Sequence, residues 1–236
     1  MSDTTNQLLI NLNSLVTGLF LLTAFGIVAM RQVRGVLNLF IVQALLLATS
    51  AALLGLRYAS DHLYGVAAVN VISKAIIVPW LLRKTSPSEV YTRREVTQAL
   101  NIPTALLIAL ALAILAYFLG LPVLNAVAPE FRSPNVPIGI AGLLLGAFTI
   151  TVRREALPLL IGLLVMENGA FLAGIAIARN LQMLIELAIA TDGLIIVFIM
   201  GVLTRAVQKQ IGTTAVGELA SLKEATVEPA EKEAAQ

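Results

Sequence analysis

The sequence contains no cysteine and a single histidine among its 236 residues. The absence of cysteine excludes disulfides, thiolate metal sites, iron–sulfur clusters and cysteine nucleophiles, and one histidine cannot form a multi-histidine metal site. No Walker, dinucleotide-binding or nucleophile-elbow motif occurs in the chain either. We therefore expect a protein that holds no metal, cofactor or redox centre of its own.

Charged residues are also scarce. They make up 13% of the chain, against 58% hydrophobic residues, whereas a soluble domain is about a quarter charged. Together with a mean hydropathy of +0.89, this composition excludes a water-soluble globular fold. The formal net charge is +2, but the basic residues lie between apolar runs and form no single patch, so we expect no nucleic-acid partner.

Long apolar runs are what the sequence does contain. A bilayer core about 30 Å thick is crossed by roughly 20 apolar residues of α-helix, and seven runs are close to this length. They predict an all-α, polytopic integral membrane protein with about seven transmembrane helices. The predicted spans are 8–30, 35–56, 63–82, 104–121, 138–152, 156–178 and 181–207.

The loop charges predict the orientation of these spans, because Lys and Arg in short loops stay on the cytoplasmic side. One side of the membrane receives only three basic residues, Arg57, Arg132 and Arg179. The other side receives Arg31, Arg34, Arg83, Lys84, Arg93, Arg94, Arg153, Arg154, Arg205 and Lys209. This asymmetry predicts an N-terminus outside and a C-terminus in the cytoplasm.

The spans suggest a division of the chain into four parts. Residues 1–99 form an N-terminal three-helix unit, 100–136 a connecting helix with a proline-rich outer loop, 137–211 a second three-helix unit, and 212–236 a polar cytoplasmic tail. Both three-helix units have a basic turn after the first span and a charge within the third. This layout is consistent with a parallel internal repeat, and chance similarity between leucine-rich helices is the alternative.

Four ionisable residues interrupt the spans: Lys74, Glu167, Glu186 and Asp192. At a helix centre such a residue costs about 2.5–3.5 kcal/mol on insertion scales, so it usually faces the bundle interior and serves function. Burial disfavours the charged forms of acids and lysines, and a nearby opposite charge offsets this, so a buried carboxylate near Lys74 can exchange protons. We therefore predict a proton relay. The alternative is a permanent ion pair of Lys74 with Asp192 or Glu167 that fixes helix register.

The two acids of the last span differ in depth. Glu186 and Asp192 lie on different helix faces and about 9 Å apart along the axis, so they cannot form one metal site, although water can link them. Glu186 lies nearer the outer surface, where contact with water explains it almost as well as a relay does.

Several uncharged polar residues accompany these charges. Asn70 in the third span and Asn168 beside Glu167 are candidates to support the relay, although interhelical hydrogen bonding explains such residues too. His62 in the predicted outer loop either collects protons or is an ordinary solvated histidine. Small residues that allow close helix packing are predicted at Gly139, Gly142, Gly146, Gly162 and Gly169.

Residues 153–169, which begin Arg-Arg-Glu-Ala-Leu-Pro and end Met-Glu-Asn-Gly, resemble the second helix of the K subunit of complex I and the C subunit of Mrp antiporters. That helix follows a basic turn and carries a membrane-centred glutamate. Asp192 lies where the K family has a second buried carboxylate. The match departs from the family in two ways, since the family's glutamate aligns with Leu164, one turn before Glu167, and Asp192 replaces a glutamate.

The whole chain resembles component E of hydrogenase-4 and related formate hydrogenlyase complexes. This resemblance implies a noncatalytic, nonredox subunit in the membrane arm of a group 4 [NiFe]-hydrogenase in a bacterial or archaeal cytoplasmic membrane. The implied neighbours are lipid, a complex I H-like subunit and an antiporter-like subunit, with the soluble hydrogenase module in indirect contact.

Under this interpretation Glu167 and Asp192 exchange protons, Lys74 tunes or relays, and Glu186 with Asn168 organises water. Two other functions stay open: a purely structural scaffold of the same complex, and an independent secondary transporter. The transported ion is either the proton or sodium.

Overall fold

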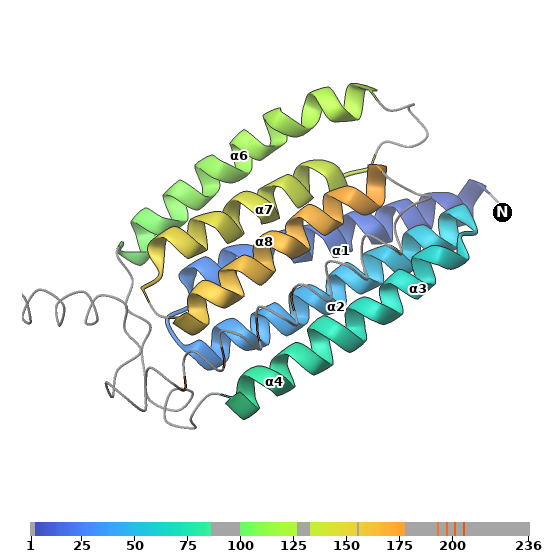
Figure 1. The fold of residues 1–236 in the computed structure, drawn as a ribbon. Coiled ribbons are helices and arrows are strands. Elements are labelled where there is room, and N and C mark those ends of the chain that lie inside the picture. The colour runs from blue at the N-terminus through green and yellow to red at the C-terminus, as the bar shows by residue number, and fades with distance from the viewer. Residues whose placement is uncertain are drawn as a thin grey trace, which may run out of the picture.

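The computed structural model describes residues 3–85, 100–126, 133–154 and 156–177, together with residues 193, 197, 201 and 205. Over these residues the chain is helical and holds no β-strand, which confirms the predicted all-α class. The helices pack side by side as a bundle with roughly aligned axes (Figure 1). Their bounds are α1 Asp3–Ala29, α2 Val33–Tyr58, α3 Asp61–Asn70, η1 Val71–Ile77, α4 Val78–Thr85, α6 Ile102–Ala126, α7 Asn135–Val152 and α8 Ala156–Ile177.

Helices α3 and α4 are joined without a break by the π-helix η1, so the three elements form one rod, which we call the α3–α4 rod. Counting this rod as one helix, the described part of the chain has six helices long and apolar enough to cross a membrane. The first six predicted spans are therefore confirmed, and the protein is a multi-pass membrane protein.

The helix ends differ from the predicted ones at several places. α1 begins at Asp3, α6 continues through Pro122 to Ala126, and α7 begins at Asn135 within the predicted proline-rich loop. The physical reason is that hydropathy marks only the hydrocarbon core, whereas a helix can continue through the headgroup layers on either side of it.

The seventh predicted span lies outside the described residues except at four positions. These are Gly193, Val197, Gly201 and Arg205, which are all helical, and the first three are buried. Their spacing of four residues places neighbours on one helix face. The total of seven helices, the orientation of the termini and the division into four parts stay predictions.

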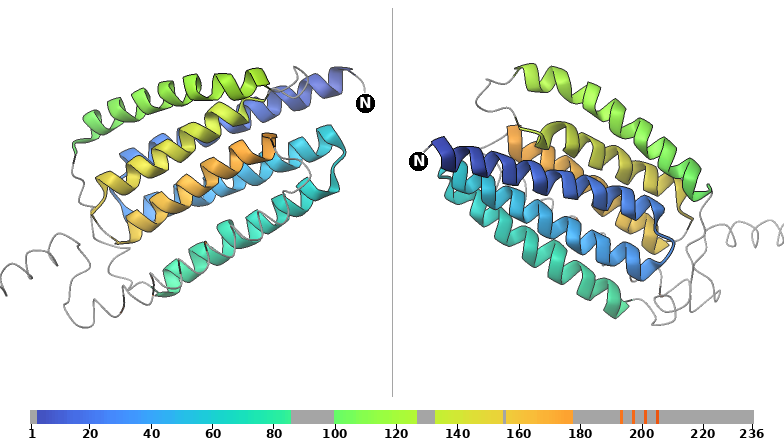
Figure 2. Two further views of the ribbon diagram at one scale, coloured as in Figure 1. Left: turned by 45° about the horizontal axis from the view of Figure 1, so that its top comes forward. Right: turned by 180° about the vertical axis from the view of Figure 1, so that it is seen from behind.

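Helix α2 is central in the bundle, since it contacts α1, the α3–α4 rod and α8. Helix α6 lies at one edge, against α7 and α1, and the α3–α4 rod lies on the opposite side in both views of Figure 2. Small side chains make the buried face of α6, namely Ala105, Ala109, Ala116 and Gly120. Its large side chains, such as Leu107 and Phe118, point outward, as expected for a helix that faces lipid.

Helices α7 and α8 approach so closely that their glycines have no room for a side chain. A Cβ atom would lie 2.4 Å from the Ala173 nitrogen at Gly139, and 2.3 Å from the Met166 nitrogen at Gly146. At Gly169 it would lie 2.1 Å from the Leu143 nitrogen. The prediction of close packing at these glycines is confirmed, and the contact fixes which face of α8 turns toward α2.

Two apolar clusters fill the space around α2. The first apolar cluster lies toward the α1–α2 turn and consists of Ile27, Val33, Val36, Leu37, Phe40, Val78, Leu82, Leu157, Leu160, Ile161, Leu164, Val165 and Val197. The second apolar cluster lies toward the α2–α3 turn and consists of Phe20, Leu47, Ala51, Leu54, Leu63, Val66, Phe171, Leu172 and Ile175.

One of the basic residues that we counted as an orientation signal is buried. Arg153, only 4% exposed, donates hydrogen bonds from Nη2 to the carbonyls of Ile27, Val28 and Met30. These carbonyls lie at the end of α1, where the last turn of a helix lacks backbone donors and attracts positive charge. Arg153 therefore caps α1 and ties it to the α7–α8 turn, whereas its neighbour Arg154 is exposed.

A ring of buried polar side chains joins α1, α2 and α7, and we call it the asparagine network. Asn13 Nδ2 donates to Asn135 Oδ1 at 2.7 Å, Asn135 Nδ2 donates to Ser50 Oγ at 2.8 Å, and Ser50 Oγ donates to Asn13 Oδ1 at 2.7 Å. Ser133 Oγ also donates to Asn135 Oδ1. Each member is at most 5% exposed, so hydrogen bonds within the network replace those to water.

Candidate functional site

A layer of polar side chains separates the two apolar clusters. We call it the polar layer, and its described members are Gln43, Asn70, Ser73, Lys74, Glu167 and Asn168. Its three supports, α2, the α3–α4 rod and α8, each contribute residues to the first apolar cluster on one side of the layer and to the second on the other. The layer is thus enclosed by apolar side chains toward both ends of the bundle.

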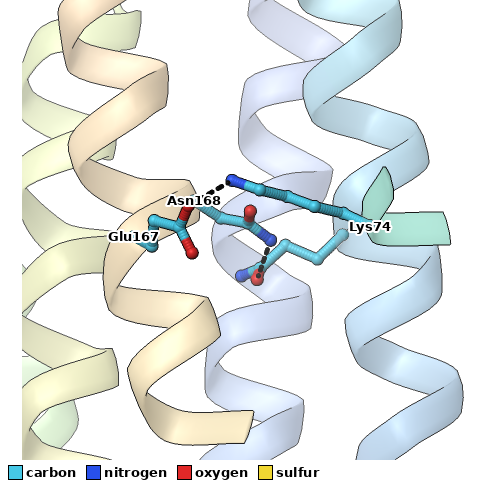
Figure 3. Close-up of polar contacts among 4 residues, drawn as sticks. Lys74, Glu167 and Asn168 are labelled. Atoms are coloured by element: carbon cyan, nitrogen blue, oxygen red, sulfur yellow. Dashed lines mark hydrogen bonds and ion pairs between the residues drawn. The ribbon is translucent and has the colours of Figure 1, made fainter. Parts of the chain in front are cut away.

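An ion pair lies within the polar layer. Lys74 Nζ is 3.2 Å from Glu167 Oε1, and the two side chains are 3% and 18% exposed. Figure 3 shows the Lys74 side chain reaching across to Glu167 on α8. The Lys74 ammonium also lies 5.6 Å from the ring centre of Phe171, one turn further along α8. Of the two partners considered for Lys74 in the sequence, the structure brings Glu167 to it.

Lys74 lies in a π-helical segment, and Pro79 explains why. Val78 donates its backbone N–H to the carbonyl of Ser73, five residues earlier. Pro79 has no N–H, and its ring displaces the carbonyl four residues before it. The preceding turn widens as a result, and the Lys74 carbonyl receives a backbone hydrogen bond from neither Val78 nor Pro79. Such π-helical turns occur frequently at functional sites.

The wider turn also decides which side chains face the bundle. Asn70, Lys74, Val78 and Leu82 follow one another at intervals of four residues, and each is at most 2% exposed. In an α-helix, a four-residue step rotates the side chain by about 40°, so three steps move it well off its original face. The π-helix has more residues per turn and removes most of this drift. It therefore keeps Lys74 on the same buried face as Asn70 and Val78.

Two amide side chains lie beside the ion pair. Asn168 Nδ2 donates to Gln43 Oε1 at 3.3 Å, and both residues are fully buried. The other ends of these amides, Gln43 Nε2 and Asn168 Oδ1, make no hydrogen bond to any residue that the structure describes. The same holds for both amide atoms of Asn70 and for Ser73 Oγ.

The remaining predicted site residues have different outcomes. Glu186 and Asp192 lie outside the described residues, but Gly193, next to Asp192, is described. A Cβ atom at Gly193 would lie 3.3 Å from Glu167 Oε2, so this part of the chain lies against the carboxylate. His62 is exposed in the first turn of α3 and not in a loop. It lies about 18 Å along the helix from Lys74.

Ser73 was not among the residues predicted from the sequence for this layer. Its position in the sequence could have indicated it. Ser73 directly precedes Lys74 and lies three residues after Asn70, a spacing that places two side chains on one helix face. The asparagine network was missed as well. Its residues lie near the ends of the predicted spans. Asparagine and serine are common at such positions and do not by themselves indicate a buried cluster.

Comparisons with known proteins agree with the sequence resemblance. Hydrogenase-4 component E of Escherichia coli (strain K12) is 29% identical over 217 residues, which cover 88% of this chain and 95% of that protein. Component E of Shigella flexneri matches equally well. An uncharacterized protein of Mycobacterium tuberculosis is 28% identical over 207 residues, covering 88% of this chain and 94% of the relative.

No protein-family model and no solved structure matches the chain. The narrower resemblance of residues 153–169 to the K subunit of complex I stays a prediction. Over most of its length, however, the chain is similar to hydrogenase-4 component E, which confirms the resemblance seen in its sequence.

Proposed function

We propose that this chain is a noncatalytic membrane-arm subunit of a group 4 [NiFe]-hydrogenase and contributes to proton translocation through Glu167 and Lys74. The similarity to hydrogenase-4 component E supports its place in such a complex. The proposed location is the cytoplasmic membrane of a bacterium or archaeon. Its proposed partners are a complex I H-like subunit, an antiporter-like subunit and, indirectly, the soluble hydrogenase module.

The observation that carries the proton-transfer role is the ion pair between Lys74 and Glu167 in an apolar environment. At 3.2 Å and an effective dielectric constant of about 20, two unit charges attract each other by about 5 kcal/mol before desolvation is counted. A proton that arrives at Glu167 removes one charge and switches this attraction off. Protonation therefore changes the force on Lys74, and departure of the proton restores it.

The position of the polar layer supports proton movement within the plane of the membrane. Apolar clusters lie on both sides of the layer along the bundle axis, and apolar side chains are poor carriers of protons. The chain near Gly193 lies beside the Glu167 carboxylate. We infer that Asp192 receives or supplies protons there, with Glu186 as a further station nearer the outer surface.

The Glu167→Gln variant in the intact membrane complex tests this role, because glutamine keeps the shape and removes the titrating group. We expect proton translocation into vesicles to fall about a hundredfold or more, as for a positioned proton-transfer group. Hydrogenase activity with a soluble electron donor and complex assembly should be retained. Unchanged translocation in a fully assembled complex would refute the relay.

The scaffold hypothesis makes the opposite prediction for a double variant. If the polar residues only hold helices together, joint replacement by Glu167→Gln and Asp192→Asn leaves proton translocation intact. Mass-spectrometric identification of copurified proteins tests the partners. A nickel–iron hydrogenase large subunit together with an antiporter-like subunit supports the proposed complex, and recovery of this chain alone favours an independent transporter.

A further inference from the structure

The polar layer contains buried hydrogen-bonding groups that the described residues leave unpaired. Asn70 is fully buried, and neither its amide nitrogen nor its amide oxygen has a partner in the part of the chain that the structure describes. Ser73 is 5% exposed and its hydroxyl is also unpaired. Folded proteins rarely leave buried polar atoms in this state without an ordered water or another ligand.

These groups surround the ion pair from three helices. On the α3–α4 rod, Asn70 lies one turn before Lys74 and Ser73 directly precedes it. On α8, Asn168 follows Glu167, and its hydrogen bond to Gln43 extends the set to α2. Gln43 Nε2 and Asn168 Oδ1 are the unpaired ends of that bonded pair.

Among the described residues, the unpaired amide and hydroxyl groups gather in this layer, apart from Asn6 Oδ1 near the start of α1. Asn13 and Asn135 are equally buried, and in the asparagine network both their amide nitrogens and their amide oxygens are paired. The fold can therefore pair buried amides completely where it brings them together. In the polar layer only Asn168 and Gln43 among the amides pair with each other, and each keeps one unpaired end, while Asn70 and Ser73 reach no described partner.

We propose that the polar layer is a binding site for ordered water beside the Lys74–Glu167 pair. The chemistry of the unpaired groups selects water over an ion. Gln43 Nε2 and Asn70 Nδ2 are donors, Asn70 Oδ1 and Asn168 Oδ1 are acceptors, and Ser73 Oγ is both. A cation needs oxygen ligands alone and is repelled by Lys74, whereas an anion needs donors alone. Water donates and accepts, and a buried water needs two to four polar partners.

Bound water gives Glu167 a mobile proton donor and acceptor inside an otherwise apolar bundle. A water molecule held by Asn70 and Ser73 can pass a proton to or from the carboxylate without movement of a helix. This consequence rests on the proposed proton-transfer function, whereas the water site itself does not.

Radiolytic footprinting of the intact complex tests the site independently of activity, because X-ray pulses convert bound water into hydroxyl radicals that oxidise adjacent side chains. Phe171 is the reporter, since it is 5% exposed and contacts Lys74. Phe20 is the matched control, since it is 1% exposed in the same second apolar cluster. We expect oxidation of Phe171 to exceed that of Phe20 several-fold. Equal oxidation of the two rings would overturn the proposal.

Variants of Asn70 and Ser73 test whether these two residues hold the proposed water. Asn70→Leu should lower the oxidation of Phe171 several-fold, and Ser73→Ala, which removes a single hydroxyl, should lower it less. Asn13→Leu in the asparagine network should leave it unchanged. If both layer variants leave Phe171 labelling as in the parent, these residues do not hold the water and the proposal fails.

Proton translocation by the same variants separates this proposal from the proposed function. Loss of labelling together with reduced translocation in Asn70→Leu supports both. Loss of labelling with full translocation supports the water site and refutes its part in proton transfer. No labelling in the parent, combined with reduced translocation in Glu167→Gln, refutes the water site and leaves the function of Glu167 standing.

Discussion

The asparagine network and the polar layer are both buried polar clusters that join α2 to its neighbours, yet their chemistry differs. The network is uncharged, and its amides and hydroxyls pair with one another at 2.7–2.8 Å. The polar layer holds an ion pair and several polar atoms with no partner among the described residues. Complete pairing stabilises a fold, whereas incomplete pairing costs about 1–3 kcal/mol per group. Under the proposed hydration, ordered water in the polar layer offsets this cost.

Buried asparagines in this bundle differ in whether they hydrogen-bond to a neighbouring helix. Interhelical hydrogen bonding was one of the two explanations weighed for Asn70 and Asn168. It applies to Asn168, which donates to Gln43, and to Asn13 and Asn135. It does not apply to Asn70, which makes no hydrogen bond to any described residue. The residue type is asparagine in each case. Whether an asparagine links two helices or belongs to the candidate site depends on the side chains packed around it.

The largest expected effect on stability follows removal of one charge from the polar layer. Lys74→Met leaves Glu167 as a buried acid without its lysine, and breaking a buried ion pair costs about 3–5 kcal/mol. Thermal unfolding in detergent should show this loss. The double variant Lys74→Met with Glu167→Gln should recover most of it, because no charge is then left uncompensated. If the double variant is as unstable as the single one, the pair contributes through packing and not through charge.

A glycine substitution should disturb the polar layer through the helix that carries it. Gly146→Ala places a Cβ against the backbone of Met166, the residue before Glu167. Overpacking of this kind costs about 1–3 kcal/mol, and α8 must shift relative to α7 to relieve it. Proton translocation should fall together with thermal stability. The matched control is Gly174→Ala on α8, where a Cβ meets nothing within 4 Å; an equal loss there would refute this explanation.

An asparagine-to-leucine substitution, made once in the asparagine network and once in the polar layer, tests most directly whether the two clusters differ in role. Asn13→Leu removes two hydrogen bonds of the asparagine network, the one from Asn13 to Asn135 and the one from Ser50 to Asn13. The buried Ser50 hydroxyl then lacks its acceptor, at a cost of about 1–3 kcal/mol. Asn70→Leu removes no hydrogen bond to a described residue, so the free energy of unfolding should change less. The order of the two should reverse for proton translocation. Denaturant unfolding measures the free energy of unfolding, and a vesicle assay measures proton translocation. If Asn13→Leu and Asn70→Leu change each quantity equally, the two clusters do not differ in role.

The smallest expected effect concerns the aromatic ring beside the lysine. The Phe171 ring attracts the Lys74 ammonium, and cation–π contacts contribute about 0.5–2 kcal/mol. Phe171→Leu should therefore lower stability slightly and slow proton translocation, while Phe171→Tyr, which keeps the ring, should restore both. Phe20→Leu controls for lost packing, since Phe20 lies in the same apolar cluster. A similar slowing of translocation in Phe20→Leu would assign the effect to packing alone.

The sequence by itself determined the membrane class and six of the spans. A span needs only enough consecutive apolar residues to cross the hydrocarbon core, and this property is local. The sequence also identified Lys74 and Glu167 as candidates, because a charge within an apolar run is costly wherever it lies. The likeness to hydrogenase-4 component E was visible in the sequence for the same reason, since it depends on residues in order along the chain.

The tertiary structure alone decided how these residues meet. Asn13 and Asn135 are 122 positions apart, and Arg153 reaches carbonyls more than 120 positions before it. Such contacts have no local pattern. In a soluble helix the apolar face would at least indicate which residues turn inward, but lipid-facing and protein-facing residues are both apolar here. The pairing of Lys74 with Glu167, and the unpaired groups around them, follow from the packing of α2, α8 and the α3–α4 rod.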